Sequence, residues 1–196
     1  MIGILDSGVG GLSIYKVIKE EHSNLGVVYF ADKKNFPYGD KSERKLREIT
    51  SYAVNTLVNH DADIVIIACN SATVSTIKFL RTQFDVPIIG IEPAVKQAAK
   101  ETKSGIIGIM ATKRTLKSHD SEHLAPGQKL IKKEAPGLVF KIENNYLDIT
   151  DDELKEAVQE YLDAGVDSIV GLMNIFWWLK RPLFVNVKPK TSIFLI

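Results

Sequence analysis

The chain contains a single cysteine, Cys69, and the residues around it are of types that can take part in proton transfer or nucleophilic catalysis. Cys69 ends an apolar run, residues 64–68, and is followed directly by Asn70 and Ser71. At the start of a helix, backbone amides can lower a thiol pKa from about 8.5 toward neutrality. Packing remains the alternative interpretation, because free cysteines are often buried as small apolar residues.

The segment DSGVGGLS, residues 6–13, follows a short apolar run and precedes a helical pattern. Its glycines free backbone N–H groups that could approach an anion. The segment lacks the lysine of a Walker motif, and its glycine spacing departs from the dinucleotide-binding pattern. A tight strand-to-helix turn is the alternative. Asp6 adds a carboxylate that could orient a neighbouring acid/base group.

A second polar segment, YFADKKNFPYGDKS, contains a turn that would hold Tyr38 rigidly between Pro37 and Gly39. The alternative is a surface turn with a packed aromatic ring. No metal site is expected, because His119 and His123 share a helical spacing but have no further obvious ligands. A single cysteine also excludes an internal disulfide and a cysteine-based zinc site.

The composition is typical of a globular protein, with 196 residues, 45% hydrophobic, 25% charged and a formal net charge of +1. This balance gives no electrostatic footprint for nucleic acid. The N-terminus does not resemble a signal peptide, and no apolar run is long enough to cross a membrane. We therefore expect a cytoplasmic protein without nucleic-acid or membrane partners.

Short β-branched runs alternate with helical patterns along the chain. Strands are predicted at residues 2–5, 27–30, 64–68, 87–90, 105–110, 138–142 and 168–172, and helices near 11–21, 41–59, 72–83, 93–101 and 151–163. The alternation predicts an α/β fold with parallel sheets covered by helices on both faces. In such folds ligands bind beyond the carboxyl ends of the strands, where Cys69 lies. For the polar segment 113–135 no strand or helix is predicted.

A faint internal repeat divides the chain. IGILDS (2–7) reappears as IGIMAT (107–112), and ADIVIIACN (62–70) reappears as VDSIVGLMN (166–174). The two matches have nearly the same offset, so we expect two related α/β halves. Ser7 then matches Thr112, and Cys69 matches Met173. A cleft between the halves would place one group from each on opposite sides of a ligand.

With these motifs in order, the chain resembles the cofactor-independent aspartate/glutamate racemase family, in particular its glutamate-specific members. The resemblance spans residues 2 to about 170 and rests on GILDSGVGGLS, YFADKKNFPYGDKS, DIVIIACNSA, VPIIGIEPA, GIIGIMATKRTLKS and GVDSIV. It implies two pseudo-symmetric domains with the active site in the interdomain cleft. We assign residues 1–96 to the first domain and 97–186 to the second. The first domain looks truncated, and residues 187–196 could belong to it.

The resemblance also implies an activity, which is the interconversion of L- and D-glutamate for peptidoglycan synthesis. One cysteine thiolate removes the α-proton and a second thiol delivers a proton to the opposite face, without pyridoxal phosphate or a metal. The expected partner is the small-molecule substrate glutamate, and a homodimer is a possible assembly.

Residue roles follow from the same resemblance. Cys69 corresponds to the first proton-transfer cysteine, and Asp6 to the carboxylate beside it. Residues matching the substrate pocket are Ser7, Pro37, Tyr38, Gly39, Asn70, Ser71, Thr112 and Thr115, and two further acidic matches near the cleft are Asp32 and Glu143.

One departure from the family pattern concerns the second cysteine. The family carries Gly-Cys-Thr-His where this chain has LMNI, so Met173 occupies the position of the second cysteine. Methionine has no ionisable proton and cannot act as an acid or base. We therefore expect proton exchange on one face at most. The alternatives are an inactive relic or carboxylate-binding protein, and a Cys69 hydrolase or transferase, which would need a histidine base.

Overall fold

The computed structural model describes residues 1–92, 94–118, 121–134, 136–145, 149–171 and 192–195. The chain divides into two compact units, Met1–Glu92 and Pro93–Ile196. The division lies four residues before the predicted domain boundary.

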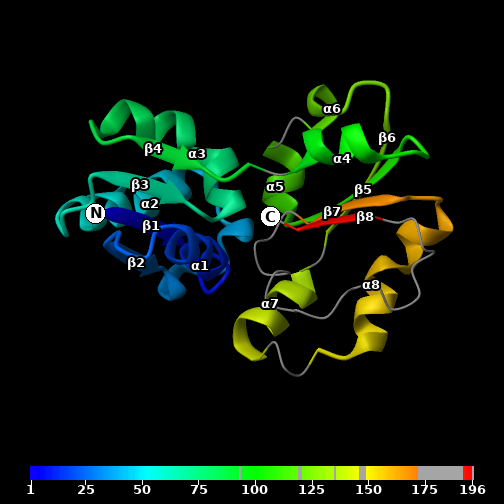
Figure 1. The fold of residues 1–196 in the computed structure, drawn as a ribbon, viewed down its shortest axis with the longest axis horizontal. Helices are drawn as coiled ribbons and strands as arrows, with labels where there is room; N and C mark the ends of the chain where they lie inside the picture. Colours follow the sequence, from blue (N-terminus) through cyan, green and yellow to red (C-terminus); the bar gives the residue numbers. More distant parts are fainter. Residues whose placement is uncertain (93, 119–120, 135, 146–148, 172–191, 196) are drawn as a thin grey trace. The chain divides into compact units, whose positions relative to one another are not determined.

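The first unit is a four-stranded parallel sheet with strand order β2-β1-β3-β4 (Figure 1). Its elements are β1 (Ile2–Asp6), α1 (Leu12–Glu21), β2 (Val27–Ala31), the 3-10 turns η1 (Lys33–Asn35) and η2 (Tyr38–Asp40), α2 (Glu43–Val58), β3 (Ile64–Ile67), α3 (Asn70–Gln83) and β4 (Ile88–Gly90). These strands and helices confirm the elements predicted for this half of the sequence.

Successive side chains of each strand point to opposite faces of this sheet. Leu5 and Ile67 pack with α2 and α3 in one core cluster. Their neighbours Ile4 and Ile66 point to the opposite face and pack with α1. A strand buried on both faces needs a continuous apolar run, which is why these strands read as uninterrupted β-branched stretches.

The second unit is also a four-stranded parallel sheet, with strand order β6-β5-β7-β8. Its elements are α4 (Val95–Glu101), β5 (Ile106–Ala111), α5 (Lys113–Ser118), α6 (Ser121–Leu124), β6 (Lys129–Glu134), α7 (Pro136–Asn145), α8 (Asp151–Asp163), β7 (Ser168–Gly171) and β8 (Ser192–Leu195). β8 pairs with β7, so residues 192–195 join this sheet, whereas the sequence left open that they belong to the first domain.

The two sheets have the same topology, and their registers reproduce the internal repeat. Ile4 pairs with Ile66 in the first sheet, and the residues 105 and 104 positions later, Ile109 and Val170, pair in the second. Position 173 is therefore the counterpart of Cys69 by register, but Met173 lies outside the described residues.

The predicted strand at 138–142 is wrong, because these residues belong to α7. Val139, Ile142 and Glu143 are buried while Phe140 is exposed, which is the spacing of a helix face. The strand of this region is β6, in the segment that had no assignment. β6 lies at the edge of its sheet, where lysines are common, and its sequence KLIKKE lacks the apolar pattern of a central strand.

The helix predicted near residues 151–163 is confirmed as α8, and its start is capped. The Thr150 hydroxyl accepts a hydrogen bond from the Glu153 backbone N–H at 3.3 Å. The Glu153 carboxylate accepts one from the Thr150 N–H at 3.1 Å, which completes a capping box.

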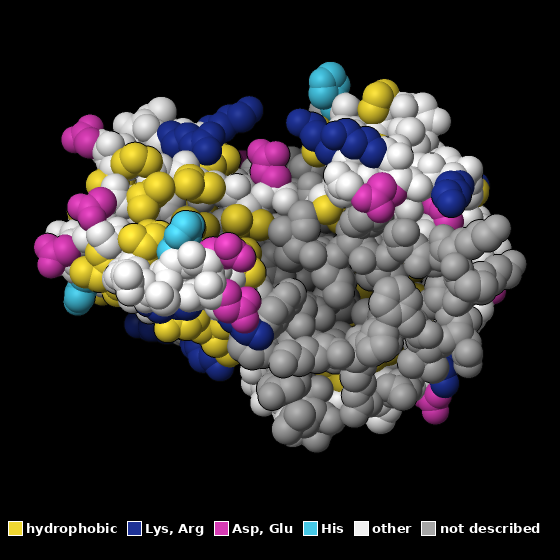
Figure 2. Space-filling view, viewed as in Figure 1, with side chains coloured by type: hydrophobic (Ala, Val, Ile, Leu, Met, Phe, Trp, Pro, Cys, Tyr) yellow, Lys and Arg dark blue, Asp and Glu magenta, His cyan; other side chains and the backbone are white. Residues whose placement is uncertain are grey.

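The surface of the first unit carries apolar side chains interspersed among polar ones (Figure 2). Tyr15 and Val17 are exposed on α1, whereas Tyr52 is exposed on α2, across the sheet. Scattered exposed apolar residues do not mark a docking surface. Of the helices that the structure describes, none has the length and apolarity to span a bilayer.

Candidate active site

The carboxyl ends of three adjacent strands carry the predicted site residues of the first unit. Asp6 ends β1, Asp32 follows β2 and Cys69 follows β3, in strands that are hydrogen-bonded neighbours. Parallel strands end at the same edge of a sheet, so the fold gathers these three side chains. All three are buried, with relative exposures of 5%, 7% and 8%.

Cys69 is the N-cap residue of α3, with extended backbone angles. Its Sγ lies 3.7 Å from the Ser7 Oγ, within hydrogen-bonding reach for sulfur. The backbone amides of Ala72 and Ser71, in the first turn of α3, also interact with the thiol and favour its ionised form. The thiol therefore faces several donors that can stabilise a thiolate.

The pKa of Cys69 nevertheless moves in the direction opposite to the sequence prediction. Burial, followed by the negative charge of Asp6, raises the pKa of the thiol to about 12. The amides of α3 and the Ser7 hydroxyl lower it, but their combined effect is smaller. The prediction of a lowered pKa is thus wrong for the unliganded protein, because desolvation outweighs the helix terminus.

This balance predicts the reactivity of the only thiol in the chain. Alkylation of Cys69 by iodoacetamide should accelerate with pH without a plateau below about pH 10, because only the thiolate reacts. Asp6→Asn should increase the rate at about pH 8.5, since it removes a charge that raises the pKa. Ser7→Ala should decrease it, since it removes a hydrogen bond that lowers the pKa. A plateau near the free-thiol pKa of about 8.5 would contradict the burial of Cys69.

The glycine-rich loop is a strand-to-helix turn built around Asp6. The Gly8 N–H donates to the Asp6 Oδ2 at 2.9 Å, and the Gly8 carbonyl accepts from the Tyr29 hydroxyl at 2.8 Å. In a phosphate-binding loop the backbone N–H groups point at the anion, whereas here the Gly8 N–H already donates to the Asp6 carboxylate. The turn interpretation therefore holds. Sequence analysis missed the role of Tyr29, whose position within a conventional strand gave no signal.

Gly11 allows α1 to approach the strands closely. A Cβ atom at this position would lie 2.8 Å from the Tyr29 hydroxyl and 2.9 Å from the Cβ atoms of Ala68 and Asp6. Gly11→Ala should therefore lower the free energy of unfolding by about 1–3 kcal/mol in urea denaturation, the usual cost of overpacking. Gly137→Ala is the matched control, because no atom lies within 4 Å of its Cβ position, and it should cause no loss.

Asn70 presents an unpaired acceptor at the first turn of α3. Its Nδ2 donates to the Ile91 carbonyl at 3.2 Å, which fixes the orientation of the amide. Its Oδ1 is buried and accepts no hydrogen bond from the residues that the structure describes. An unsatisfied buried acceptor is costly, so this oxygen is suited to an N–H donor of a ligand. Ser71, the next residue, is also buried.

The turn between Pro37 and Gly39 inserts Tyr38 into the core instead of exposing it. Tyr38 is only 1% exposed and belongs to the same apolar cluster as Cys69. Its hydroxyl donates to the Asp32 carboxylate at 2.7 Å. Burial, and then this bond and the neighbouring negative charges, raise the pKa of Tyr38, so the hydroxyl stays protonated.

The remaining predicted residues belong to the second unit. Thr112 and Thr115 lie 3.1 Å apart between their hydroxyl oxygens, and the Thr115 N–H donates to the Thr112 Oγ1 at 3.3 Å. Glu143 is buried on α7 instead of ending a strand. That these three residues share a site with Cys69 stays a prediction.

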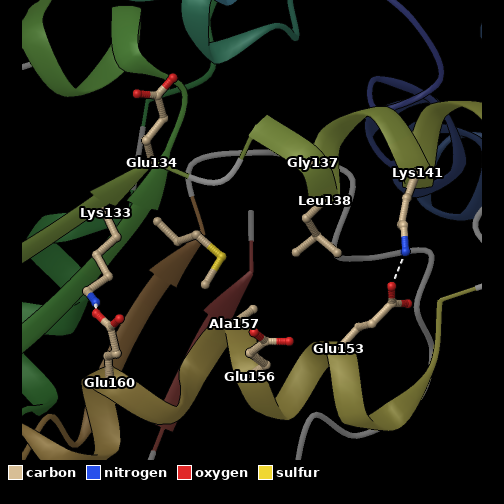
Figure 3. Close-up of a pocket in the computed structure, with 10 residues that line it drawn as sticks. Lys133, Glu134, Gly137, Leu138, Lys141, Glu153, Glu156, Ala157 and Glu160 are labelled. Atoms are coloured by element: carbon tan, nitrogen blue, oxygen red, sulfur yellow. Dashed lines mark hydrogen bonds and ion pairs between the residues drawn. The ribbon is translucent and has the colours of Figure 1, made fainter.

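A hollow of about 420 Å³ lies within the second unit, between β6, α7 and α8 (Figure 3). Its two lysines are both engaged, Lys133 with Glu160 and Lys141 with Glu153. None of the predicted site residues lines this hollow.

Comparison with known proteins places the chain in a family. The family model for Asp/Glu/hydantoin racemases matches residues 2–170. The chain belongs to this racemase family. The chain is therefore an amino-acid racemase, which is an isomerase, and it resembles the glutamate racemases.

Individual members of the racemase family agree with this assignment. The chain is 38% identical to the glutamate racemase of Clostridium perfringens over 86% of this chain and 68% of that protein. It is 36% identical to the glutamate racemase of Pseudomonas entomophila over 96% and 73%, respectively. The crystal structure of Escherichia coli glutamate racemase with L-glutamate and the activator UDP-MurNAc-Ala superposes with a TM-score of 0.89 at 29% identity, covering 98% of this chain and 76% of that one.

Proposed function

We propose that the chain exchanges the α-proton of glutamate, with Cys69 as the proton-transfer group on one face of the substrate. The observation that carries this proposal is the environment of the Sγ atom. It lies 3.7 Å from the Ser7 hydroxyl, beside the Asp6 carboxylate and the amides that begin α3. A thiol surrounded by these groups can accept and return a proton, whereas a packing cysteine needs no such partners.

The ammonium group of the substrate would supply a positive charge that the unliganded site lacks. An amino acid bound with its ammonium group near Asp6 and the unpaired Asn70 Oδ1 would offset the carboxylate charge. The pKa of Cys69 would then fall, because the charge of Asp6 is, after burial, the second-largest cause of the raised pKa. The thiolate would form with substrate present and remain protected without it.

The proton balance of the step is simple. The Cys69 thiolate removes the α-proton and becomes a thiol, and the electron pair remains on the α-carbon as a carbanion beside the carboxylate. Thr112 and Thr115 are proposed to donate hydrogen bonds to that carboxylate and stabilise the developing charge. The thiol returns its proton to the same face, or water protonates the opposite face, because the sequence has methionine and not a second cysteine at position 173.

Incubation of L- and D-glutamate in D₂O, followed by ¹H NMR, tests this function. We expect one enantiomer to lose its α-proton signal faster than it racemises. Brisk racemisation of both enantiomers would contradict one-face exchange. Binding of glutamate by calorimetry without any exchange would instead establish the alternative of a carboxylate-binding protein.

A cysteine hydrolase or transferase is a weaker candidate. His22 ends α1 and His60 follows α2, so both lie where the strands begin, at the opposite edge of the sheet from Cys69. The His60 Nδ1 already contacts the Thr56 carbonyl at 2.8 Å. Neither histidine of the first unit is positioned to activate the thiol.

A further inference from the structure

Asp32 is the buried carboxylate of the first unit that the proposed proton transfer does not use. Its backbone N–H donates to the Asp6 carbonyl at 2.9 Å, which ties it to the strand that carries the Asp6 carboxylate. Its side chain is turned toward the segment that follows β2. Asn35 Nδ2 lies 3.0 and 2.9 Å from its two oxygens, and the Tyr38 hydroxyl lies 2.7 Å from Oδ2.

These hydrogen bonds occupy the Asp32 carboxylate within the loop that follows β2, which contains Asn35 and Tyr38. Both oxygens accept hydrogen bonds from neutral donors, and the residue is only 7% exposed. A general acid or base must be able to reach the substrate. The Tyr38 hydroxyl is committed in the same way, because it has one proton and donates it to Asp32.

The loop held by Asp32 packs directly against the element that presents Cys69. The turn η2, which begins at Tyr38, contacts α3. The Tyr38 ring and Cys69 belong to one apolar cluster with Leu5. A hydrogen bond at the base of this loop therefore acts on the packing around the thiol.

We infer that Asp32 is a positioning residue, whose carboxylate holds Tyr38 as the buried wall that shields Cys69 from solvent. Loss of either partner removes the hydrogen bond that holds the loop closed, so the loop would open; loss of the acceptor also leaves the Tyr38 hydroxyl buried and unpaired, which is costly. The effect depends on the acceptor oxygen of Asp32 and not on its charge. This inference deepens the proposed function, on which it rests for the role of Cys69.

Alkylation of the single thiol by iodoacetamide at about pH 8.5 tests the inference without requiring turnover. Asp32→Ala should increase the rate about tenfold, the equivalent of one buried hydrogen bond. Tyr38→Phe should increase it by a similar factor, and the double variant should not exceed Asp32→Ala alone, because both changes break the same bond. Asp32→Asn keeps an acceptor for Tyr38 and should remain within about threefold of the unmodified chain.

Thr50→Val provides the matched control for general loosening of the first unit. The Thr50 hydroxyl is fully buried and donates to the Leu46 carbonyl of its own helix at 2.7 Å, so its loss breaks no hydrogen bond of Asp32 or Tyr38. This variant should leave the alkylation rate unchanged. If Thr50→Val accelerated alkylation as much as Asp32→Ala does, lost stability would explain the effect of Asp32→Ala, and the inference would be overturned.

Other outcomes separate this inference from the proposed function. If Asp32→Asn accelerates alkylation as much as Asp32→Ala while Tyr38→Phe has no effect, Asp32 acts through its charge and the inference is overturned. If the expected pattern holds but glutamate exchanges no α-proton in D₂O, the positioning role stands and the proposed function fails.

Discussion

Replacement of Cys69 by serine is expected to reduce α-proton exchange of glutamate by about 10³-fold, within the contribution of about 10²- to 10⁴-fold usual for a positioned general base. Serine preserves the size of the side chain but has a far higher pKa, so it cannot supply the base. The rate of α-deuterium incorporation from D₂O, followed by ¹H NMR, measures the effect. Glutamate should still bind, since Asn70 and the loop around Asp6 are intact.

Two controls make this result specific. Circular dichroism and the urea midpoint should show that Cys69→Ser folds, because the residue is the N-cap of α3 and serine is favoured at that position. Alkylation of the unmodified chain should abolish exchange to the same degree, since Cys69 is its only thiol. Exchange that survives both changes would remove Cys69 from the mechanism.

Introduction of a thiol at position 173 is expected to convert one-face exchange into racemisation. Met173→Cys places an ionisable proton at the position that the internal repeat relates to Cys69. A positioned thiol should protonate the carbanion on the opposite face about 10²-fold faster than water does. Circular dichroism of the glutamate solution measures the gain, because only racemisation changes the optical signal.

Met173→Ser is the matched control for this second prediction. It makes the same reduction in side-chain size but adds no group that ionises near neutral pH, so exchange should remain confined to one enantiomer. Replacement of LMNI by the Gly-Cys-Thr-His sequence of the family should increase racemisation further. A failure of both thiol variants, with Cys69 exchange intact, would refute the two-sided arrangement implied by the repeat.

The alternation of apolar runs and helical patterns was sufficient to predict the four strands of the first sheet, and β5 and β7 of the second. Central strands buried on two faces have an unmistakable composition, and the capping residues of α8 stand in the sequence itself. The repeat of IGILDS in IGIMAT also predicted two units of one topology. The miss at α7 has a physical cause, because a short run such as LVFKI fits a helix face and a strand equally well.

The residues of the candidate site followed from the sequence, but their chemical states did not. Position at a strand end pointed to Asp6 and Cys69, whereas Asp32 was predicted only through the family resemblance. The sign of the Cys69 pKa shift depended on burial and on the charge of Asp6, which outweigh the amides of α3. Neither quantity can be read from local sequence.

What the sequence determined by itself is therefore the order of the elements in the first unit and the identity of the thiol, because periodicity and residue type are local properties. The tertiary structure alone decided that Tyr38 faces inward onto Asp32, that Tyr29 secures the loop after β1, and that the Asn70 Oδ1 has no partner among the residues that the structure describes. Hydrogen bonds and desolvation depend on which distant groups meet, and only folding brings those groups together.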